Sequence, residues 1–233
     1  MKSTHLLRPV FTERTWQKLA GGAALHIQGT KALGLERLLS DVKSLSRTAT
    51  IWMELDLAEF GRDVQSLFSA WARAFSMEVA PTDFREFVGV LKANGVATTL
   101  VIRNLGAAVT EGADPNFHTK LFEQLNVANL IPQIGLLTID SKSMAELELA
   151  DTWLHEEKRL PPLGFRRIQE ELERKLPELK TPVAIVSGVF AHPQPFPFLE
   201  YVINEGQLQT DLSGWNSQAQ VDRLIEGFAK SEG

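Results

Sequence analysis

The sequence has 233 residues, of which 44% are hydrophobic, and its 24 lysines and arginines against 29 aspartates and glutamates give a net charge of −5 at pH 7. This composition is typical of globular proteins, and the length allows one large domain or one domain with a small appendage. The absence of cysteine excludes disulfides, thiolate metal sites and a cysteine nucleophile. The negative charge argues against broad, unspecific nucleic-acid binding and leaves a local basic groove open. No apolar run reaches the roughly 18 to 20 residues that span a bilayer, and no signal-peptide core follows the first methionine, so we expect a soluble, cytoplasmic protein with no membrane partner.

The N-terminal part of the chain predicts a helix, a strand, a loop and a second helix, in that order. Residues 11–20 are amphipathic and are followed by two glycines, which end a helix well. Residues 23–28 form an apolar run that we interpret as a strand. A loop bounded by Gly29 and Gly34 follows, and residues 35–45 carry apolar side chains at helical spacing.

The central part alternates strands with helices. Residues 50–57, 97–105 and 134–139 are apolar runs typical of buried strands, and residues 63–76, 83–93 and 117–127 have helical spacing. A short fifth strand is expected near residues 158–160. Strands that alternate with helices at this spacing predict an α/β fold with a parallel sheet in three layers.

The composition changes at Pro161-Pro162, where we place a subdomain boundary. We therefore expect an α/β domain over residues 1–163 and a small helical subdomain over residues 164–233, with helices at residues 164–179, 196–206 and 216–230. Residues 182–190 are ambiguous, because their β-branched residues favour a strand whereas Thr181 followed by Pro182 favours a helix start.

The glycine-bounded loop lies where a phosphate-binding loop would lie, between a strand and a helix. The full motif is G-x-x-x-x-G-K-[ST], in which the lysine reaches the phosphates and the hydroxyl binds Mg²⁺. Both glycines are present at the motif spacing, but Leu35 stands in the lysine position and Glu36 in the hydroxyl position. Lys31 lies within the loop, away from the motif position.

Beyond the loop, the chain resembles P-loop ATPases of the AAA+ and STAND type. Their loop is similar to GxxGxGKTRLL, and Arg37, Leu38 and Leu39 continue that pattern here. Their Mg²⁺-binding and water-activating acids follow an apolar strand, and the equivalent strand here is followed by Arg103 and Asn104. Residues 160–177 and 183–202 are similar to the helical lid of such proteins, and this similarity favours a helix at residues 182–190.

The resemblance implies a nucleotide site that has lost its chemical groups. Arg103 cannot bind Mg²⁺ and Asn104 cannot act as a base, so no catalytic residue, metal site or cofactor is expected. We also expect Glu36 and Arg103 to form an ion pair in the vacated metal site. The degenerate nucleotide-binding residues are Gly29, Thr30, Lys31, Gly34, Leu35 and Glu36, and the degenerate metal and water-activating residues are Arg103 and Asn104.

The expected function is that of a catalytically inactive ATPase-like protein. Because AAA+ and STAND proteins act as oligomers, the resemblance implies an adaptor or scaffold subunit in a homo- or hetero-oligomer, with an active ATPase or another subunit as partner, and DNA-linked machinery is one setting by analogy. One alternative is an unconventional nucleotide binder or weak NTPase that uses Lys31. Another is a nucleic-acid-binding module, although its basic residues alternate with glutamates as in a solvated helix. These basic residues are Arg159, Arg166, Arg167, Arg174 and Lys175.

Overall fold

The computed structural model describes residues 5–46, 50–58, 68–69, 72–73, 81–82, 86, 89–90, 93, 98–106, 134–147, 156–180 and 182–232. The chain divides into two compact units. The sheet unit comprises Phe11–Gly29 and Val42–Arg159, and the helical unit comprises Met1–Val10, Thr30–Asp41 and Leu160–Gly233. The domain boundary that the sequence predicts, between residues 163 and 164, stays a prediction.

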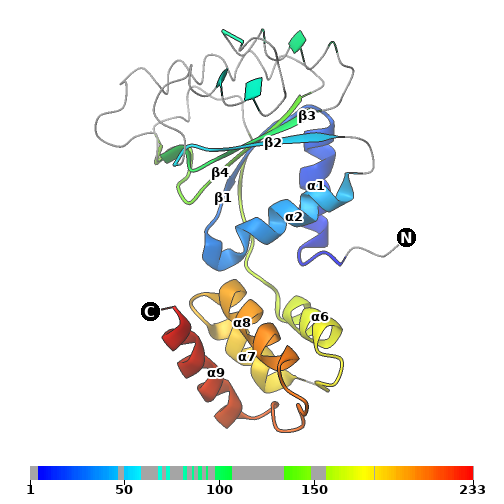
Figure 1. Ribbon diagram of the computed structural model, residues 1–233, viewed down its shortest axis with the longest axis vertical. Coiled ribbons are helices and arrows are strands. Elements are labelled where there is room, and N and C mark those ends of the chain that lie inside the picture. The colour runs from blue at the N-terminus through cyan, green and yellow to red at the C-terminus, as the bar shows by residue number, and fades with distance from the viewer. Residues whose placement is uncertain are drawn as a thin grey trace. The chain divides into compact units, whose positions relative to one another are not determined.

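The sheet unit contains a five-stranded sheet with the order β2-β3-β4-β1-β5, drawn in Figure 1. Every pair of neighbouring strands is parallel, which confirms the predicted α/β class. The first four strands lie within one or two residues of their predicted bounds, and the fifth begins two residues before the predicted one. The strands are β1 (Ala24–Gln28), β2 (Ile51–Asp56), β3 (Thr98–Arg103), β4 (Ile134–Asp140) and β5 (Glu156–Arg159).

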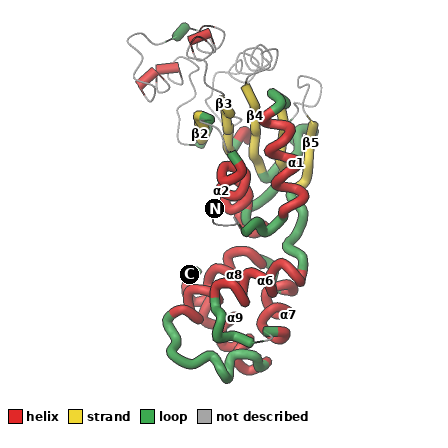
Figure 2. Tube along the Cα trace, turned by 90° about the vertical axis from the view of Figure 1, so that its right-hand side faces the viewer, coloured by secondary structure: helices red, strands yellow, loops and turns green. Residues whose placement is uncertain are grey.

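Helix α1 (Pro9–Ala20) packs on the sheet, as Figure 2 shows beside β4 and β5. The rings of Trp16 and Trp52 on β2 lie 5.9 Å apart. A Cβ atom at Gly135 on β4 would lie 2.6 Å from the Leu19 carbonyl oxygen, so the close approach of α1 requires glycine there. The helix begins two residues before the predicted position, because proline fits the first turn of a helix well.

The interior strands β3 and β4 are buried on both faces. The side chains of Val101, Ile102 and Leu137 are no more than 1% exposed, as expected for strands covered by helices. The edge strand β5 is charged instead, and Lys18 on α1 forms an ion pair with its first residue, Glu156. Charged edge strands discourage pairing with other chains.

The helices predicted between the strands fall largely outside the described residues. Residues 68–69, 72–73, 86, 89–90 and 93 are described, and all of them are helical, as predicted. Phe68 and Ala72 are buried, which fits the predicted apolar stripe of the helix at residues 63–76. The helix predicted at residues 117–127 lies wholly outside the described part of the chain.

The helical unit is built from four C-terminal helices that surround an apolar core (Figure 1). A helix at Val183–Ala191 confirms the helix interpretation of residues 182–190 and excludes the strand. The N–H of Ala184 in the first turn donates to Asn216 Oδ1 at 2.9 Å, and Gly188 allows close packing on Val221. Among the described helices, none is long and apolar enough to span a membrane. The helices are α6 (Phe165–Lys175), α7 (Val183–Ala191), α8 (Pro195–Gln207) and α9 (Gln218–Ser231).

His26 on β1 is a fully buried titratable group in the sheet unit. Its Nδ1 lies 2.9 Å from Thr138 Oγ1, and its Nε2 lies 3.0 Å from the Lys142 carbonyl oxygen. Because a carbonyl can only accept, Nε2 carries the proton and Nδ1 accepts from the threonine hydroxyl. Burial lowers the pKa of His26 below its ordinary value of 6.5, although the Lys142 carbonyl and the charges of Glu157 and Asp140 raise it in part.

We therefore expect the protein to lose stability as the pH falls below about 6.5. In that range the unfolded chain takes up a proton on His26 before the folded protein does, so protonation favours unfolding, with a slope of at most about 1.4 kcal/mol per pH unit for one proton. His26→Gln keeps a donor and an acceptor but does not titrate, and urea unfolding between pH 7.5 and 5.5 should show a flatter pH dependence than in the wild type. Equal slopes for the two proteins would contradict this assignment.

Candidate functional site

The glycine-bounded loop folds into a short 3₁₀ turn, η1 (Lys31–Leu33), which leads into helix α2 (Leu35–Leu45). The N–H of Leu33 donates to the Thr30 carbonyl at 3.0 Å, and the N–H of Gly34 donates to the Lys31 carbonyl at 2.9 Å. A phosphate-binding loop instead directs its N–H groups at the anion. In this loop, two such groups are already used by the loop itself.

Gly34 adopts a left-handed conformation, with φ 79° and ψ 45°, which glycine tolerates best. A Cβ atom at this position would lie 2.5 Å from the aromatic ring of Phe196, in the first turn of α8. The ring is buried, with 5% of the residue exposed. The space directly above the second glycine of the motif is therefore filled by a phenylalanine side chain.

Beside this ring, a pocket of about 510 Å³ is lined by the loop, α2, α8 and α9. Its charged residues are two cations, Lys31 and Arg37, and three carboxylates, Glu36, Glu200 and Glu232. Burial raises the pKa of Glu200 above its ordinary value, although the charges of Arg37 and Lys31 oppose this. The excess of carboxylates makes the pocket a poor site for a polyphosphate.

The pocket brings together three of the predicted nucleotide-binding residues, Lys31, Gly34 and Glu36. Leu35 is half-buried and lies outside this lining, and Thr30 is exposed beside the loop. Gly29 belongs to the sheet unit, where its N–H donates to the Asp140 carbonyl at 2.8 Å.

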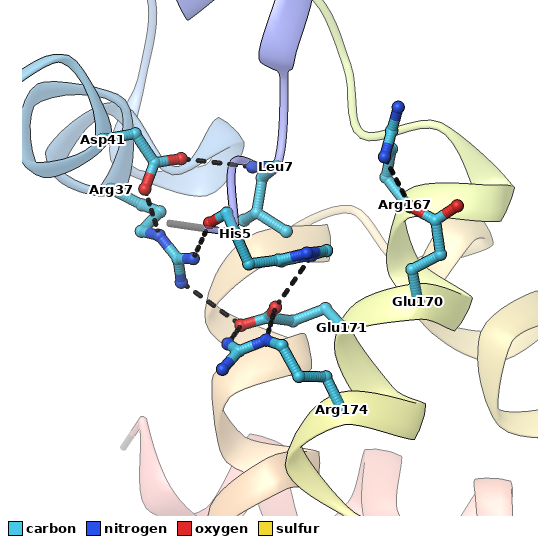
Figure 3. Close-up of polar contacts among 8 residues, drawn as sticks. All are labelled: His5, Leu7, Arg37, Asp41, Arg167, Glu170, Glu171 and Arg174. Atoms are coloured by element: carbon cyan, nitrogen blue, oxygen red, sulfur yellow. Dashed lines mark hydrogen bonds and ion pairs between the residues drawn. The ribbon is translucent and has the colours of Figure 1, made fainter. Parts of the chain in front are cut away.

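A second polar cluster in the helical unit surrounds Glu171 of α6, and Figure 3 shows its side chains pointing toward one another. Glu171 is only 1% exposed. Arg174 donates to its two oxygens at 3.0 and 2.6 Å, Arg37 donates at 3.3 Å, and His5 Nε2 lies 3.2 Å from Oε2. Burial alone would raise the pKa of Glu171, but the hydrogen bonds and charges of Arg174 and Arg37 lower it below its ordinary value.

Arg37 links this cluster to the start of α2 (Figure 3). Its Nε donates to Asp41 Oδ1 at 2.7 Å, and its Nη2 donates to the His5 carbonyl at 3.2 Å. The other carboxylate oxygen of Asp41 accepts the N–H of Leu7 at 3.2 Å. Burial lowers the pKa of Arg37, but Asp41 and Glu171 outweigh it and raise the pKa above its ordinary value. The Arg37 guanidinium thus forms its ion pairs with the carboxylates of Asp41 and Glu171.

Arg8 holds the loop from the N-terminal segment. Its Nε donates to the Pro161 carbonyl at 2.7 Å, and its Nη2 donates to the Leu33 carbonyl. Arg8 is 7% exposed, and this burial lowers its pKa to about 10, with partial compensation by the charge of Asp41. A planar guanidinium suits this role because its N–H groups can reach two acceptors at once.

The interpretation of the basic region on α6 as a solvated helix is wrong for Glu171. Arg166 and Arg167 do pair with the partly exposed Glu170, at 2.9 and 2.5 Å, as a solvated face would. Glu171, however, lies three residues after the buried Ile168 and so shares the buried face of the helix. That spacing was the signal in the sequence for a paired carboxylate inside the helical unit.

Arg103 and Asn104, which the sequence predicts to be a degenerate metal-binding and water-activating motif, lie at the carboxyl end of β3 in the sheet unit. Arg103 Nη2 donates to Glu54 Oε2 on β2 at 2.6 Å, and Asn104 Nδ2 donates to Asp56 Oδ1 at 2.7 Å. Asn104 has a positive φ of 54°, a conformation that asparagine tolerates better than most residues. The ion pair predicted between Arg103 and Glu36 would join the two units and stays a prediction.

The carboxylate at the end of β4 is also used locally. Asp140 Oδ1 accepts the N–H of Lys142 at 2.9 Å, and its Oδ2 accepts the N–H of Gly106 at 2.7 Å. Within the described ranges, no group of three His, Asp or Glu side chains is placed to hold a metal ion. The polar groups at this edge of the sheet therefore stabilise turns.

No protein-family model matches the sequence, and no curated protein sequence matches it. Among solved structures, the chain resembles a chain of Drosophila ORC bound to DNA, with 13% identity, a TM-score of 0.62 and coverage of 95% of this chain and 61% of that chain. It also resembles the ORC2 protein of Aeropyrum pernix, with 13% identity, a TM-score of 0.61 and coverage of 94% and 66%. A third similar structure is Cdc6p from Pyrobaculum aerophilum, with 13% identity, a TM-score of 0.57 and coverage of 89% and 65%.

These similarities establish the fold. The three proteins have the AAA+ ATPase fold, and the parallel sheet and helices of this chain match it, as the loop resemblance predicted. The chain spans between 61% and 66% of the length of the three similar chains. At 13% identity the likeness concerns the fold and does not extend to an activity.

Proposed function

We propose that this protein is a pseudo-ATPase that acts as an adaptor or scaffold subunit in a multiprotein assembly. The observation that carries the proposal is the state of the degenerate loop: Leu35 and Glu36 replace the lysine and the hydroxyl, and Phe196 fills the space above Gly34. A carboxylate beside a desolvated phosphate is repelled by several kcal/mol. Both the charge and the space therefore disfavour a nucleotide.

The second motif supports the same proposal. Arg103 offers no oxygen ligand for Mg²⁺, and the amide of Asn104 cannot take a proton from water. Both side chains instead bond to carboxylates on β2. We therefore expect no ATP hydrolysis.

The assembly role rests on the fold. One similar structure is ORC bound to DNA, in which the similar chain is part of a complex. By this analogy we propose that the present chain forms a homo- or hetero-oligomer, with a catalytically intact ATPase or another subunit as its partner.

The test is calorimetric titration of the purified protein with ATP and with ADP, each with and without Mg²⁺, at concentrations that detect sub-millimolar binding. We expect no heat of binding in any of the four titrations. Circular dichroism of the same sample establishes that the protein is folded. A saturable signal in any titration would contradict the proposal.

An unconventional nucleotide binder is the second candidate, because Lys31 and Arg37 both line the pocket beside the loop. In that case Lys31→Ala should abolish binding, whereas Lys180→Ala, an exposed lysine in the same unit, should leave it unchanged. Binding that survives without Mg²⁺ would favour this candidate, since no described cluster could hold the metal.

A nucleic-acid-binding module is less well supported by the contacts on α6. Arg166 and Arg167 pair with Glu170, and Arg174 pairs with Glu171, so much of the basic charge is neutralised within the helix. Retention on a DNA column that falls steeply with salt would favour this candidate over the pseudo-ATPase adaptor.

A further inference from the structure

The N-terminal segment of residues 5–8 is attached to the helical unit by its backbone and by its side chains. The His5 carbonyl accepts from Arg37, and the Leu7 N–H donates to Asp41, both on α2. The Leu7 side chain is 1% exposed and belongs to the apolar core of the helical unit. Arg8 donates to the carbonyls of Leu33 and Pro161.

These attachments connect two parts of the unit that are far apart in the sequence. On one side lie the loop and the first turns of α2, reached through Leu33, Arg37 and Asp41. On the other side lie Pro161 and α6, reached through Arg8 and through the His5 side chain, which lies beside Glu171 (Figure 3). The short segment thus bridges the loop to the helices that follow residue 160.

The bridge uses groups that a loop would otherwise offer to a ligand. Arg37 lines the pocket, yet its guanidinium donates to Asp41, to Glu171 and to the His5 carbonyl. The Leu33 carbonyl is held by the buried Arg8. The ring of Phe196 on α8 lies directly against Gly34, so the loop is in contact with the helices.

We infer that residues 5–8 form a strap that keeps the loop and the first turns of α2 closed on α6 and α8, and that detaching the strap opens this part of the unit. The inference goes beyond the proposed function, because a strap can exist whether or not the pocket accepts a nucleotide. A permanently closed unit would serve an assembly as a fixed building block.

The first test is hydrogen exchange of the full chain, in the wild type and in Arg8→Gln. The amide of glutamine keeps a polar group but loses the charge and the fork that reaches two carbonyls. We expect exchange in residues 30–41 to rise by about tenfold, whereas exchange in α7, whose residues do not line the pocket beside the loop, stays within about twofold. Arg14→Gln, at an exposed arginine on α1, is the matched control and should match the wild type at residues 30–41.

Two outcomes would overturn the strap. One is unchanged exchange at residues 30–41 in Arg8→Gln, and the other is a rise of equal size in α7, which would indicate general destabilisation. Should Arg8→Gln not fold, Arg8→Lys keeps the buried charge but loses the planar fork, and the same local rise is expected at a smaller size.

A distance measurement separates the strap from the question of nucleotide binding. Because the chain has no cysteine, Ala32→Cys in η1 and Ala219→Cys on α9, neither of which lines the pocket, allow two spin labels to be placed in the helical unit alone. We expect one narrow distance distribution without ligand, the same distribution with 5 mM ATP (about five times a millimolar Kd), and a broader one in Arg8→Gln. A broad distribution in the wild type would overturn the strap, whereas ATP heat in calorimetry with an unchanged distribution would overturn only the proposed function.

Discussion

Glu171→Gln should lower the free energy of unfolding by about 3 kcal/mol, which for a chain of this size lowers the Tm by about 6–12 °C. Glutamine has nearly the same shape as glutamate, so the loss is one of charge. Removal of one partner from a buried ion pair costs about 3–5 kcal/mol, because the other partner stays behind without compensation. The lower end of this range of costs applies here, because the side chains of Arg37 and Arg174 are 24% and 40% exposed and water solvates part of their charge.

The matched control is Glu173→Gln on the same helix. Glu173 is exposed and accepts a hydrogen bond from Gln169, so its replacement should change the stability by less than about 0.5 kcal/mol. Thermal unfolding of both variants, monitored by circular dichroism, gives the comparison. Equal effects of the two substitutions would show that the cluster around Glu171 contributes nothing specific.

The same ion pairs have a pH dependence of known sign. The pKa of Glu171 is lower in the folded protein than its ordinary value of 4.5, so its contribution to stability is fully present above that value. The contribution is lost as the pH falls below about 4.5 and through the folded pKa, because the carboxylate must then be protonated. In Glu171→Gln the stability should depend less on pH in this acid range, which urea unfolding at pH 5 and pH 3.5 would measure.

Much of the fold could be predicted because its signals are local in the sequence. Strands β1 to β4 follow from apolar runs, whereas β5 is charged, and α2 begins and ends where its apolar spacing does, at Leu35 and Leu45. Residues 182–190 are an exception, since a run such as VAIVSGVF satisfies a strand and a helix equally well. Tertiary packing decided between them, through the contact of Gly188 with Val221 on α9.

The candidate site could be predicted only in part. The missing lysine and hydroxyl can be read from Leu35 and Glu36, because the motif has a fixed spacing. The partners of Arg37 could not be predicted, since Glu171 lies 134 residues away in the sequence and no local pattern connects the two. The contact between the Phe196 ring and Gly34 likewise joins segments that are distant in the sequence, so it could not be predicted from a local pattern.

Gly34→Ala should be as damaging as Glu171→Gln, for a different reason. The backbone at position 34 is left-handed, with φ 79°, and a residue that has a Cβ atom pays roughly 1–2 kcal/mol for this conformation. It also meets the Phe196 ring at 2.5 Å, and relief of such overpacking costs a further 1–3 kcal/mol or so. We expect the free energy of unfolding to fall by about 2–5 kcal/mol.

The control is Gly214→Ala, where an added Cβ meets no atom within 4 Å and the backbone has no positive φ. This substitution should be neutral or stabilise the protein by up to about 1 kcal/mol, because alanine restricts the unfolded chain. A loss at Gly34 no larger than at Gly214 would contradict the contact between the loop and α8.

The double variant Gly34→Ala/Phe196→Leu measures how much of the stability loss in Gly34→Ala comes from the contact with the Phe196 ring. Leucine vacates the space that the methyl group needs, so the two changes together should cost about 1–2 kcal/mol less than the sum of the single changes. Strict additivity would mean that backbone strain alone explains the loss.

The variant Phe196→Leu, in which the space over Gly34 is open, can then be titrated with ATP. If this variant gives no heat of binding, Leu35 and Glu36 suffice to exclude the nucleotide. New binding would show that the phenylalanine ring itself excludes it.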